Sequence, residues 1–172
     1  MGLFDMLFKK EEEKVTALPE LSVSDEAIVA IAGGELIDVT TVSDPVFAEK
    51  MMGDSIAFRY TGDKVTLCSP ANGTLSVLFP TGHAFGVTMK NGVEVLVHIG
   101  IETVNAKGDG FSLAKKKQGD EVKAGDPIVT ADFAKLGKTY DISTMLIITD
   151  PKDQKITFKG PQTVKKGDPV IE

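Results

Sequence analysis

His83 and His98 are the residues of this sequence best suited to chemistry, and the 172-residue chain holds no other histidines. His98 stands in the stretch from Gly92 to Thr103, which is rich in β-branched residues and follows a turn-forming Asn-Gly pair. Such a stretch predicts a β-strand, in which successive side chains point to opposite faces. The alternation therefore decides what His98 can reach.

The two faces of this predicted strand differ in character. Apolar side chains fill one face and predict a stripe in the core, formed by Val93, Val95, Val97, Ile99 and Ile101. The other face carries Glu94, Leu96, His98, Gly100 and Glu102. A glycine beside a histidine leaves room for a molecule to approach the ring. The alternative is a surface histidine on an exposed sheet face, and this strand alone favours neither.

The pair Asn91-Gly92 predicts a two-residue hairpin loop. The preceding strand would then run antiparallel to the His98 strand, with Phe85 opposite His98 and His83 opposite Gly100. Such a register makes the two histidines diagonal neighbours on one sheet face, roughly 5–8 Å apart. A bulge or a longer loop would shift this pairing.

Several kinds of chemistry fit this sequence poorly. Cys68 follows a strand-like segment without a basic neighbour to activate it, so a small core residue is the better interpretation. A hydrolytic zinc site usually takes three protein ligands. His83 and His98 with Glu102 or Glu94 would supply three, but the HExxH pattern is absent. Phosphate-binding loops of the Walker and dinucleotide types are absent as well.

A pair of histidines suits phosphohistidine chemistry. Neutral imidazole is a good nucleophile near pH 7 because its pKa lies close by. The phosphoramidate that it forms is labile, so the phosphoryl group can be passed onward. A second histidine would hydrogen bond to the phosphoryl oxygens. Such a relay needs a shallow site, with apolar surroundings that exclude water during transfer.

The elements that must position this pair are predominantly strands. Short β-rich segments alternate with turns throughout, and 17 glycines fit many tight turns. Helical turns are expected only near Pro45 to Met52, Phe111 to Gln118 and Asp132 to Leu136. Two segments repeat a strand-turn unit around Gly-Asp-Pro, Val122 to Val129 and Val164 to Ile171. These features predict an all-β fold, an antiparallel β-sandwich or flattened barrel with internal repeats.

Composition narrows the class of partner. The formal net charge of −6 and the pI near 5.0 argue against nucleic acid or an anionic membrane as the main partner. A single cysteine excludes an internal disulfide and fits a reducing cytoplasm. Residues 1–20 are expected to be a flexible N-terminal segment, and residues 21–172 one domain. Leu3, Phe4, Leu7 and Phe8 lie at helical spacing, so residues 1–10 would suit transient contact with a membrane surface.

The sequence resembles enzyme IIA, glucose type, of the bacterial sugar phosphotransferase system. The likeness runs nearly end to end and is most specific from Gly92 to Val104, around His98, and from Thr81 to Phe85, around His83. It implies an antiparallel β-sandwich that accepts phosphate from the phosphocarrier protein HPr. The carrier would then pass the phosphate to the IIB domain of a glucose-type sugar permease, and its phosphorylation state would signal to regulatory target proteins.

The resemblance also implies roles for individual residues. His98 would be phosphorylated on Nε2, His83 would stabilise the phosphoryl group, and Thr81 would orient His83. An apolar rim for partner docking would be formed by Val46, Phe47, Phe79 and Leu96. Glu102 stands where an Asp is common, which puts its contact with a basic residue of the partner in doubt.

Two other classes of protein compete with this interpretation. A biotinyl or lipoyl carrier domain is also a repeated β-sandwich, and Lys90, after Met89, would be its modified residue. That alternative explains neither histidine. A β-sandwich zinc peptidase would need more histidines than this chain has. The carrier is expected to need no cofactor, although His83 and His98 would bind Zn²⁺ opportunistically, with a further ligand from a partner.

Overall fold

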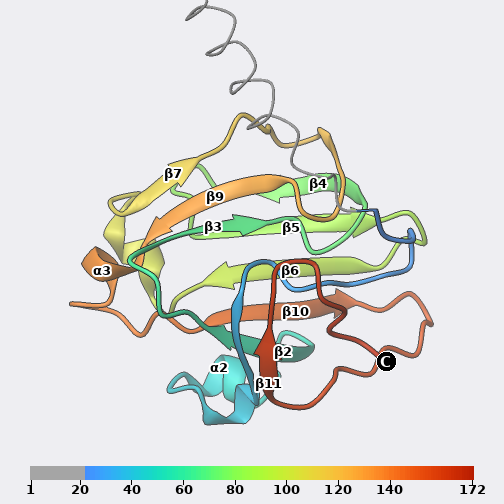
Figure 1. The fold of residues 1–172 in the computed structure, drawn as a ribbon, viewed down its shortest axis with the longest axis horizontal. Coiled ribbons are helices and arrows are strands. Elements are labelled where there is room, and N and C mark those ends of the chain that lie inside the picture. The colour runs from blue at the N-terminus through green and yellow to red at the C-terminus, as the bar shows by residue number, and fades with distance from the viewer. Residues whose placement is uncertain (1–21) are drawn as a thin grey trace, which may run out of the picture.

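The computed structural model describes residues 22–172, and within this range strands dominate. An eight-stranded antiparallel sheet has the order β11-β1-β2-β10-β6-β5-β4-β8, and a second sheet has the order β3-β9-β7 (Figure 1). The strands are β1 (Gly34–Ile37), β2 (Asp54–Arg59), β3 (Lys64–Cys68), β4 (Gly73–Leu78), β5 (Ala84–Met89), β6 (Glu94–Ile99), β7 (Phe111–Leu113), β8 (Glu121–Val122), β9 (Pro127–Asp132), β10 (Thr144–Asp150) and β11 (Gln162–Val164).

The helical elements are all short. They are the 3-10 turns η1 (Val39–Thr41) and η2 (Thr103–Ala106) and the α-helices α2 (Pro45–Ala48) and α3 (Phe133–Leu136). Asp44 caps α2 and Asp132 caps α3, each by accepting a hydrogen bond from a backbone N–H of the first turn. The predicted helical turns at Pro45 and Asp132 are thus confirmed.

The main core lies between the two sheets. Leu67 of β3 and Val129 of β9 belong to the same buried cluster as Phe85 of β5 and Val97 of β6. This two-layer arrangement confirms the predicted all-β sandwich, although the large sheet runs from β11 to β8 within the described residues and does not close into a barrel.

A second apolar cluster covers the opposite face of the large sheet. Ala57 of β2, Met145 and Ile147 of β10 and partly buried Leu96 of β6 pack there against Phe47 of α2. Figure 1 shows α2, in cyan, next to β2. This cluster positions the site because His98 lies on the same face as Leu96, directly opposite Met145 across the β6–β10 ladder.

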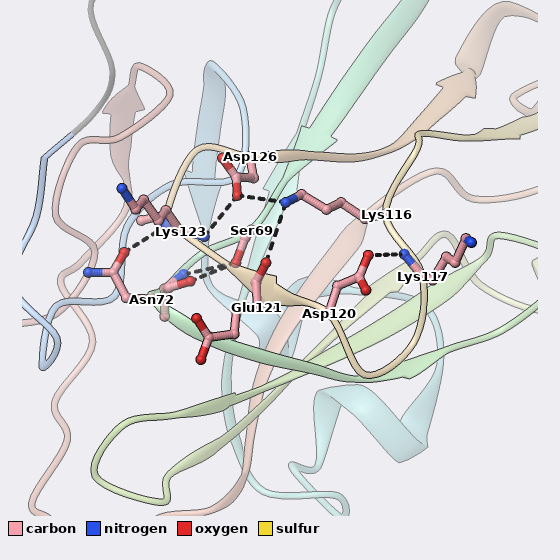
Figure 2. A network of polar contacts seen from close by, with 10 residues as sticks. Ser69, Asn72, Lys116, Lys117, Asp120, Glu121, Lys123 and Asp126 are labelled. Atoms are coloured by element: carbon pink, nitrogen blue, oxygen red, sulfur yellow. Dashed lines mark hydrogen bonds and ion pairs between the residues drawn. The ribbon is translucent and has the colours of Figure 1, made fainter.

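The repeated segments fold as the same turn, and the structure reveals a third copy. Each turn reads Lys-x-Gly-Asp and ends at Asp120, Asp126 or Asp168. In each, the Asp carboxylate accepts the backbone N–H of the Lys, as Figure 2 shows for Lys117 and Lys123. The glycines have φ near +90°, a conformation that disfavours other residues.

All three turns attach to the body of the sandwich in one way. In each turn the glycine N–H donates to the carbonyl of one residue of the sandwich. The N–H of that sandwich residue donates in return to the carbonyl of the Asp in the turn. The residues that receive the turns are Leu75, Ser69 and Ala30, and the hydrogen bonds measure 2.7–3.0 Å. The shared sequence therefore encodes a shared docking geometry.

Some predicted elements are wrong. The segment from Phe111 begins as strand β7 and not as a helical turn, because it completes the small sheet beside β9. The apolar segment at residues 28–31, which has the composition of a strand, forms only a single bridge, from Val29 to Pro169. The proposals for residues 1–20 lie outside the described residues. Within residues 22–172, no helix is long and apolar enough to cross a membrane.

The predicted hairpin register is also wrong by one residue. The loop between β5 and β6 has three residues, Lys90 to Gly92, because Met89 N–H donates to Val93 O at 2.8 Å. Gly92 has φ of 87°, which suits a three-residue hairpin with a bulge. A shift by one residue reverses the faces, so Ala84 lies opposite His98 and Phe85 turns into the main core.

Candidate active site

His98 lies on β6 near its end, half-buried on the outer face of the large sheet. Its Nδ1 lies 2.8 Å from the carbonyl oxygen of Gly100. A carbonyl only accepts hydrogen bonds, so Nδ1 carries the hydrogen. In the neutral ring the free lone pair is then on Nε2, which makes Nε2 the nucleophilic atom.

Gly100 allows a left-handed backbone turn, whereas the sequence indicated that it leaves space beside the His98 ring. Its φ of 75° lies in the left-handed region, and a Cβ atom there would lie 2.5 Å from Cγ2 of Thr103. Glycine is therefore required by the backbone turn and by the packing of Thr103, and the predicted role of leaving room beside the ring is not what the contacts indicate. The turn directs the Gly100 carbonyl back to His98.

The same turn ends the core stripe. Val93, Val95, Val97 and Ile99 lie in the main core as predicted. Ile101 follows the turn and belongs instead to the second cluster with Phe47, because the left-handed residue breaks the alternation of the strand.

His83 reaches the same site from the residue just before β5. Its ring centroid lies 5.5 Å from that of His98, with the rings at 75°. By regular alternation in the observed register His83 would face the core with Phe85. Gly82, with φ of 78°, turns the chain before the strand begins, so the alternation does not extend to His83. Its carbonyl still accepts the N–H of Ile99 at 2.7 Å, which ties it to β6.

Thr81 contacts His83 as predicted. Its Oγ1 lies 2.7 Å from Nδ1 of His83, and either atom can be the donor in this pair. The contact fixes the orientation of a ring that is only 4% exposed. Nε2 of His83 is therefore the atom that would interact with a group held between the rings.

Both imidazoles favour the neutral form. Burial lowers the pKa of His83 below its ordinary value of about 6.5. Burial likewise lowers the pKa of His98, while the hydrogen bond to Gly100 opposes that shift. His83 lowers it further, and the charge of Asp44 raises it. At pH 7 His98 is consequently uncharged and able to act as a nucleophile.

Two phenylalanines flank the pair. The ring of Phe47 lies 4.9 Å from that of His98, and the ring of Phe79 lies 4.9 Å from that of His83. Phe79 is 42% exposed and Val46 is 41% exposed, whereas Phe47 is only 7% exposed and belongs to the second cluster. Of the four residues predicted as a rim, Val46, Phe79 and half-buried Leu96 therefore form the accessible surface. Phe47 supports His98 from within.

Sequence reasoning missed Val77 and Asp44. Val77 pairs with Gly86, which pairs with Leu96, so an apolar row crosses three strands on the His98 face, with Val77 exposed and Leu96 half-buried. A β-bulge before Val77 alters the alternation of β4, which hides this relation in the sequence. Asp44 lies just before the helical turn predicted from Pro45, and its charge raises the pKa of His98.

The other residues considered as candidates are Glu102, Lys90 and Cys68. Glu102 is exposed and has a left-handed backbone, at the start of η2. Lys90 is exposed on the β5–β6 loop. Cys68 is buried, and burial raises the pKa of its thiol. Over residues 22–172, no three His, Cys, Asp or Glu side chains cluster so that they could hold a metal ion.

Comparisons with known proteins show which proteins this chain is similar to in sequence and fold. The glucose-specific EIIA component of Haemophilus influenzae is 37% identical over 172 residues, covering 99% of this chain and 97% of that protein. The solved structure of glucose permease IIA from Mycoplasma capricolum has a TM-score of 0.77 and 37% identity, covering 84% of this chain and 93% of its own.

A fused relative also matches. The glucose-specific EIICBA component of Staphylococcus carnosus is 35% identical over 92% of this chain, which spans 25% of that longer protein. The family model of the phosphoenolpyruvate-dependent sugar phosphotransferase system, EIIA 1, matches residues 26–154. The chain therefore belongs to the EIIA 1 family of the sugar phosphotransferase system.

Proposed function

We propose that this protein is a phosphoryl carrier that accepts phosphate on Nε2 of His98 from phosphorylated HPr. It passes the phosphate to the IIB domain of a glucose-type sugar permease. The observation that carries this proposal is the hydrogen bond from His98 Nδ1 to the Gly100 carbonyl, which leaves the Nε2 lone pair free beside His83. The names of the relatives, which are glucose-specific EIIA components, support the sugar class.

The proposed reaction is an in-line exchange of one P–N bond for another. The lone pair of His98 Nε2 forms a bond to phosphorus while the bond to the donor nitrogen breaks, and that nitrogen keeps the electron pair. The proton on Nδ1 of His98 stays shared with Gly100, which stabilises the ring as positive charge develops on it. No proton needs to leave the nucleophile before attack, because the ring is already neutral.

His83 is proposed to stabilise the phosphoryl group during transfer. Its ring stands edge-on to that of His98, at a distance that suits a hydrogen bond to an oxygen of the group. If Thr81 donates to Nδ1, then Nε2 of His83 carries the hydrogen and can donate to that oxygen. Thr81 would thus select the tautomer that assists the transfer.

The partners are proposed to dock on the exposed apolar surface beside the pair. Val46, Phe79 and Leu96 form this docking face, and Val77 extends it. Contact there would exclude water from the labile phosphoramidate. Fusion of an A unit with C and B units in the Staphylococcus carnosus relative supports a permease as the onward partner. Glu102 is exposed at the same end of β6, where it would pair with a basic residue of a partner.

The transfer is proposed to need no cofactor and to occur in the cytoplasm, where a free thiol such as Cys68 persists. If Zn²⁺ binds His83 and His98, a partner must complete the ligand set, since zinc prefers four ligands. Regulatory targets would distinguish the phosphorylated from the unphosphorylated docking face by its charge. The family assignment does not favour a biotinyl or lipoyl carrier modified at Lys90.

One experiment tests the central proposal. The protein is incubated with HPr, enzyme I and labelled phosphoenolpyruvate, and acid-labile, base-stable phosphate is measured. Wild-type protein should take up one phosphate, and His98→Ala should take up none while it remains folded, because His98 lies outside the main core. Normal uptake by His98→Ala would refute the assignment. A biotin or lipoate mass shift on Lys90 would favour the alternative carrier.

A further inference from the structure

The Gly100 carbonyl fixes the tautomer of His98. The backbone turn from Ile99 to Ile101 sets the direction of this carbonyl. The peptide unit that joins Gly100 to Ile101 is held at both ends. Its carbonyl accepts from His98 Nδ1 at 2.8 Å, and its N–H donates to the carbonyl of Asp141 at 2.8 Å. A trans peptide is planar with its N–H and C=O on opposite sides, so these two contacts fix its orientation.

The preceding peptide unit, between Ile99 and Gly100, is held in the same manner. Its N–H donates to the carbonyl of Ser143 at 3.0 Å. Its carbonyl accepts a hydrogen bond from the hydroxyl of Thr103. The other three contacts on these two peptide units come from the backbone or from His98 itself. Thr103 therefore supplies the one contact that a substitution can remove without changing His98.

Thr103 also contacts the turn through its methyl group. Cγ2 lies so near Gly100 that a Cβ atom there would come within 2.5 Å of it. Glu102 brings Thr103 back over the turn by adopting φ of 60°, in the left-handed region that disfavours residues other than glycine. The hydrogen bond of Thr103, which is 1% exposed, helps to hold this conformation.

We infer that Thr103 is a positioning residue for the phosphoryl acceptor. It holds the two peptide units of the turn so that Gly100 accepts from His98 Nδ1, and it thereby directs phosphorylation to Nε2. The inference rests on the proposed function, because the acceptor role of His98 is part of that proposal. Among the hydrogen bonds of residues 22–172, the Thr103 hydroxyl binds the carbonyl of Ile99 and none joins Thr103 to either ring, so its action on His98 is through the turn and the Gly100 carbonyl.

The experiment compares Thr103→Val, which keeps the shape and removes the hydroxyl, with Thr103→Ser, which keeps the hydroxyl. Nitrogen-15 NMR of the unphosphorylated proteins reports the tautomer of His98. We expect the Nδ1–H form in wild type and Thr103→Ser, and a mixture with the Nε2–H form in Thr103→Val. Phosphate uptake from HPr should fall about tenfold in Thr103→Val, as the loss of one hydrogen bond implies. The product should include ring phosphate on Nδ1.

Thr144→Val is the matched control. Thr144 is buried on β10 opposite Ile99, and its hydroxyl makes only a 3.4 Å contact with Ile142 O. It should keep the wild-type tautomer and phosphate position, so a general effect of removing a buried threonine hydroxyl is measured separately. If Thr103→Val does not fold, Thr103→Cys replaces it, since a thiol is a weak donor of similar size to serine.

The outcomes separate the two proposals. A wild-type tautomer, phosphate position and uptake rate in the folded hydroxyl-lacking variant would overturn the role of Thr103. If wild-type protein takes up no phosphate at all, the proposed function fails, but the tautomer comparison still decides whether Thr103 controls the His98 ring.

Discussion

The rings of Phe47 and Phe79 lie at the same centroid distance, 4.9 Å, from the two histidine rings, and replacing each by alanine should have opposite consequences. Phe47 is 7% exposed and packs in the second cluster, so Phe47→Ala should lower the free energy of unfolding by about 3 kcal/mol, the lower end of the range for phenylalanine in a core. Phe79 is 42% exposed, so Phe79→Ala should cost less than about 1 kcal/mol.

The effects on phosphoryl transfer should be reversed. Phe79→Ala removes part of the docking face, so transfer from HPr and to IIB should weaken, mainly through a higher apparent KM. Phe47→Ala removes apolar cover from His98, which relieves the burial that lowers its pKa. The acid limb of the uptake profile should therefore move toward higher pH in Phe47→Ala and stay in place in Phe79→Ala.

Urea unfolding measures the change in the free energy of unfolding. The change in phosphoryl transfer is measured by single-turnover phosphate uptake at several values of pH. The midpoint should fall for Phe47→Ala without a change in m-value, which indicates that only stability has changed. Equal losses of stability in the two variants, or a loss below about 1 kcal/mol in Phe47→Ala, would refute the distinction between support and docking face.

Further outcomes follow from the site. His83→Gln should still accept phosphate from HPr, but its transfer to IIB should slow by about 10²–10³-fold, since an electrostatic contact at the phosphoryl group is lost. Thr81→Val should show a milder form of the same defect. A wild-type rate of transfer to IIB in His83→Gln would show that His83 has no role in the transfer. Uptake should decline as the pH falls and His98 gains a proton, and the midpoint of this decline should lie below the ordinary imidazole value of about 6.5, because burial lowers the pKa of His98. Stability should decline over the same acidic range, since the unfolded chain binds protons that the folded histidines resist, and a pH–stability profile of His98→Asn should show a smaller decline.

Much of the site was predictable because its signals are local. The β-branched run around His98 predicts the strand, and four of its five predicted core residues are in the main core. Two of the three Lys-x-Gly-Asp turns were recognised from the sequence, because a left-handed glycine and a carboxylate that accepts a nearby N–H act within four residues. The repeated segments at Val122 and Val164 therefore fold alike wherever they occur.

The predictions from the sequence are wrong where one residue changes which face of the sheet the following side chains point to. One extra residue in the loop after Met89 moved Phe85 from the His98 face into the core. The left-handed Gly100 sent Ile101 to the second cluster. Gly82 placed His83 beside His98 although the true register alone would have separated them. Alternation is reliable only inside a regular strand, because each positive φ resets the direction of the following side chains.

The sequence by itself determined that strands would build a sandwich and that two histidines are the residues best suited to chemistry, because these follow from residue types and local spacing. Only the tertiary structure decided which nitrogen of His98 is free, which phenylalanine is buried, and that Thr103 hydrogen bonds to the turn beneath His98. Each of these depends on a contact between residues on different elements or across a left-handed turn. Whether such a contact forms depends on how whole strands approach one another, and the residue pattern within one strand does not specify that approach.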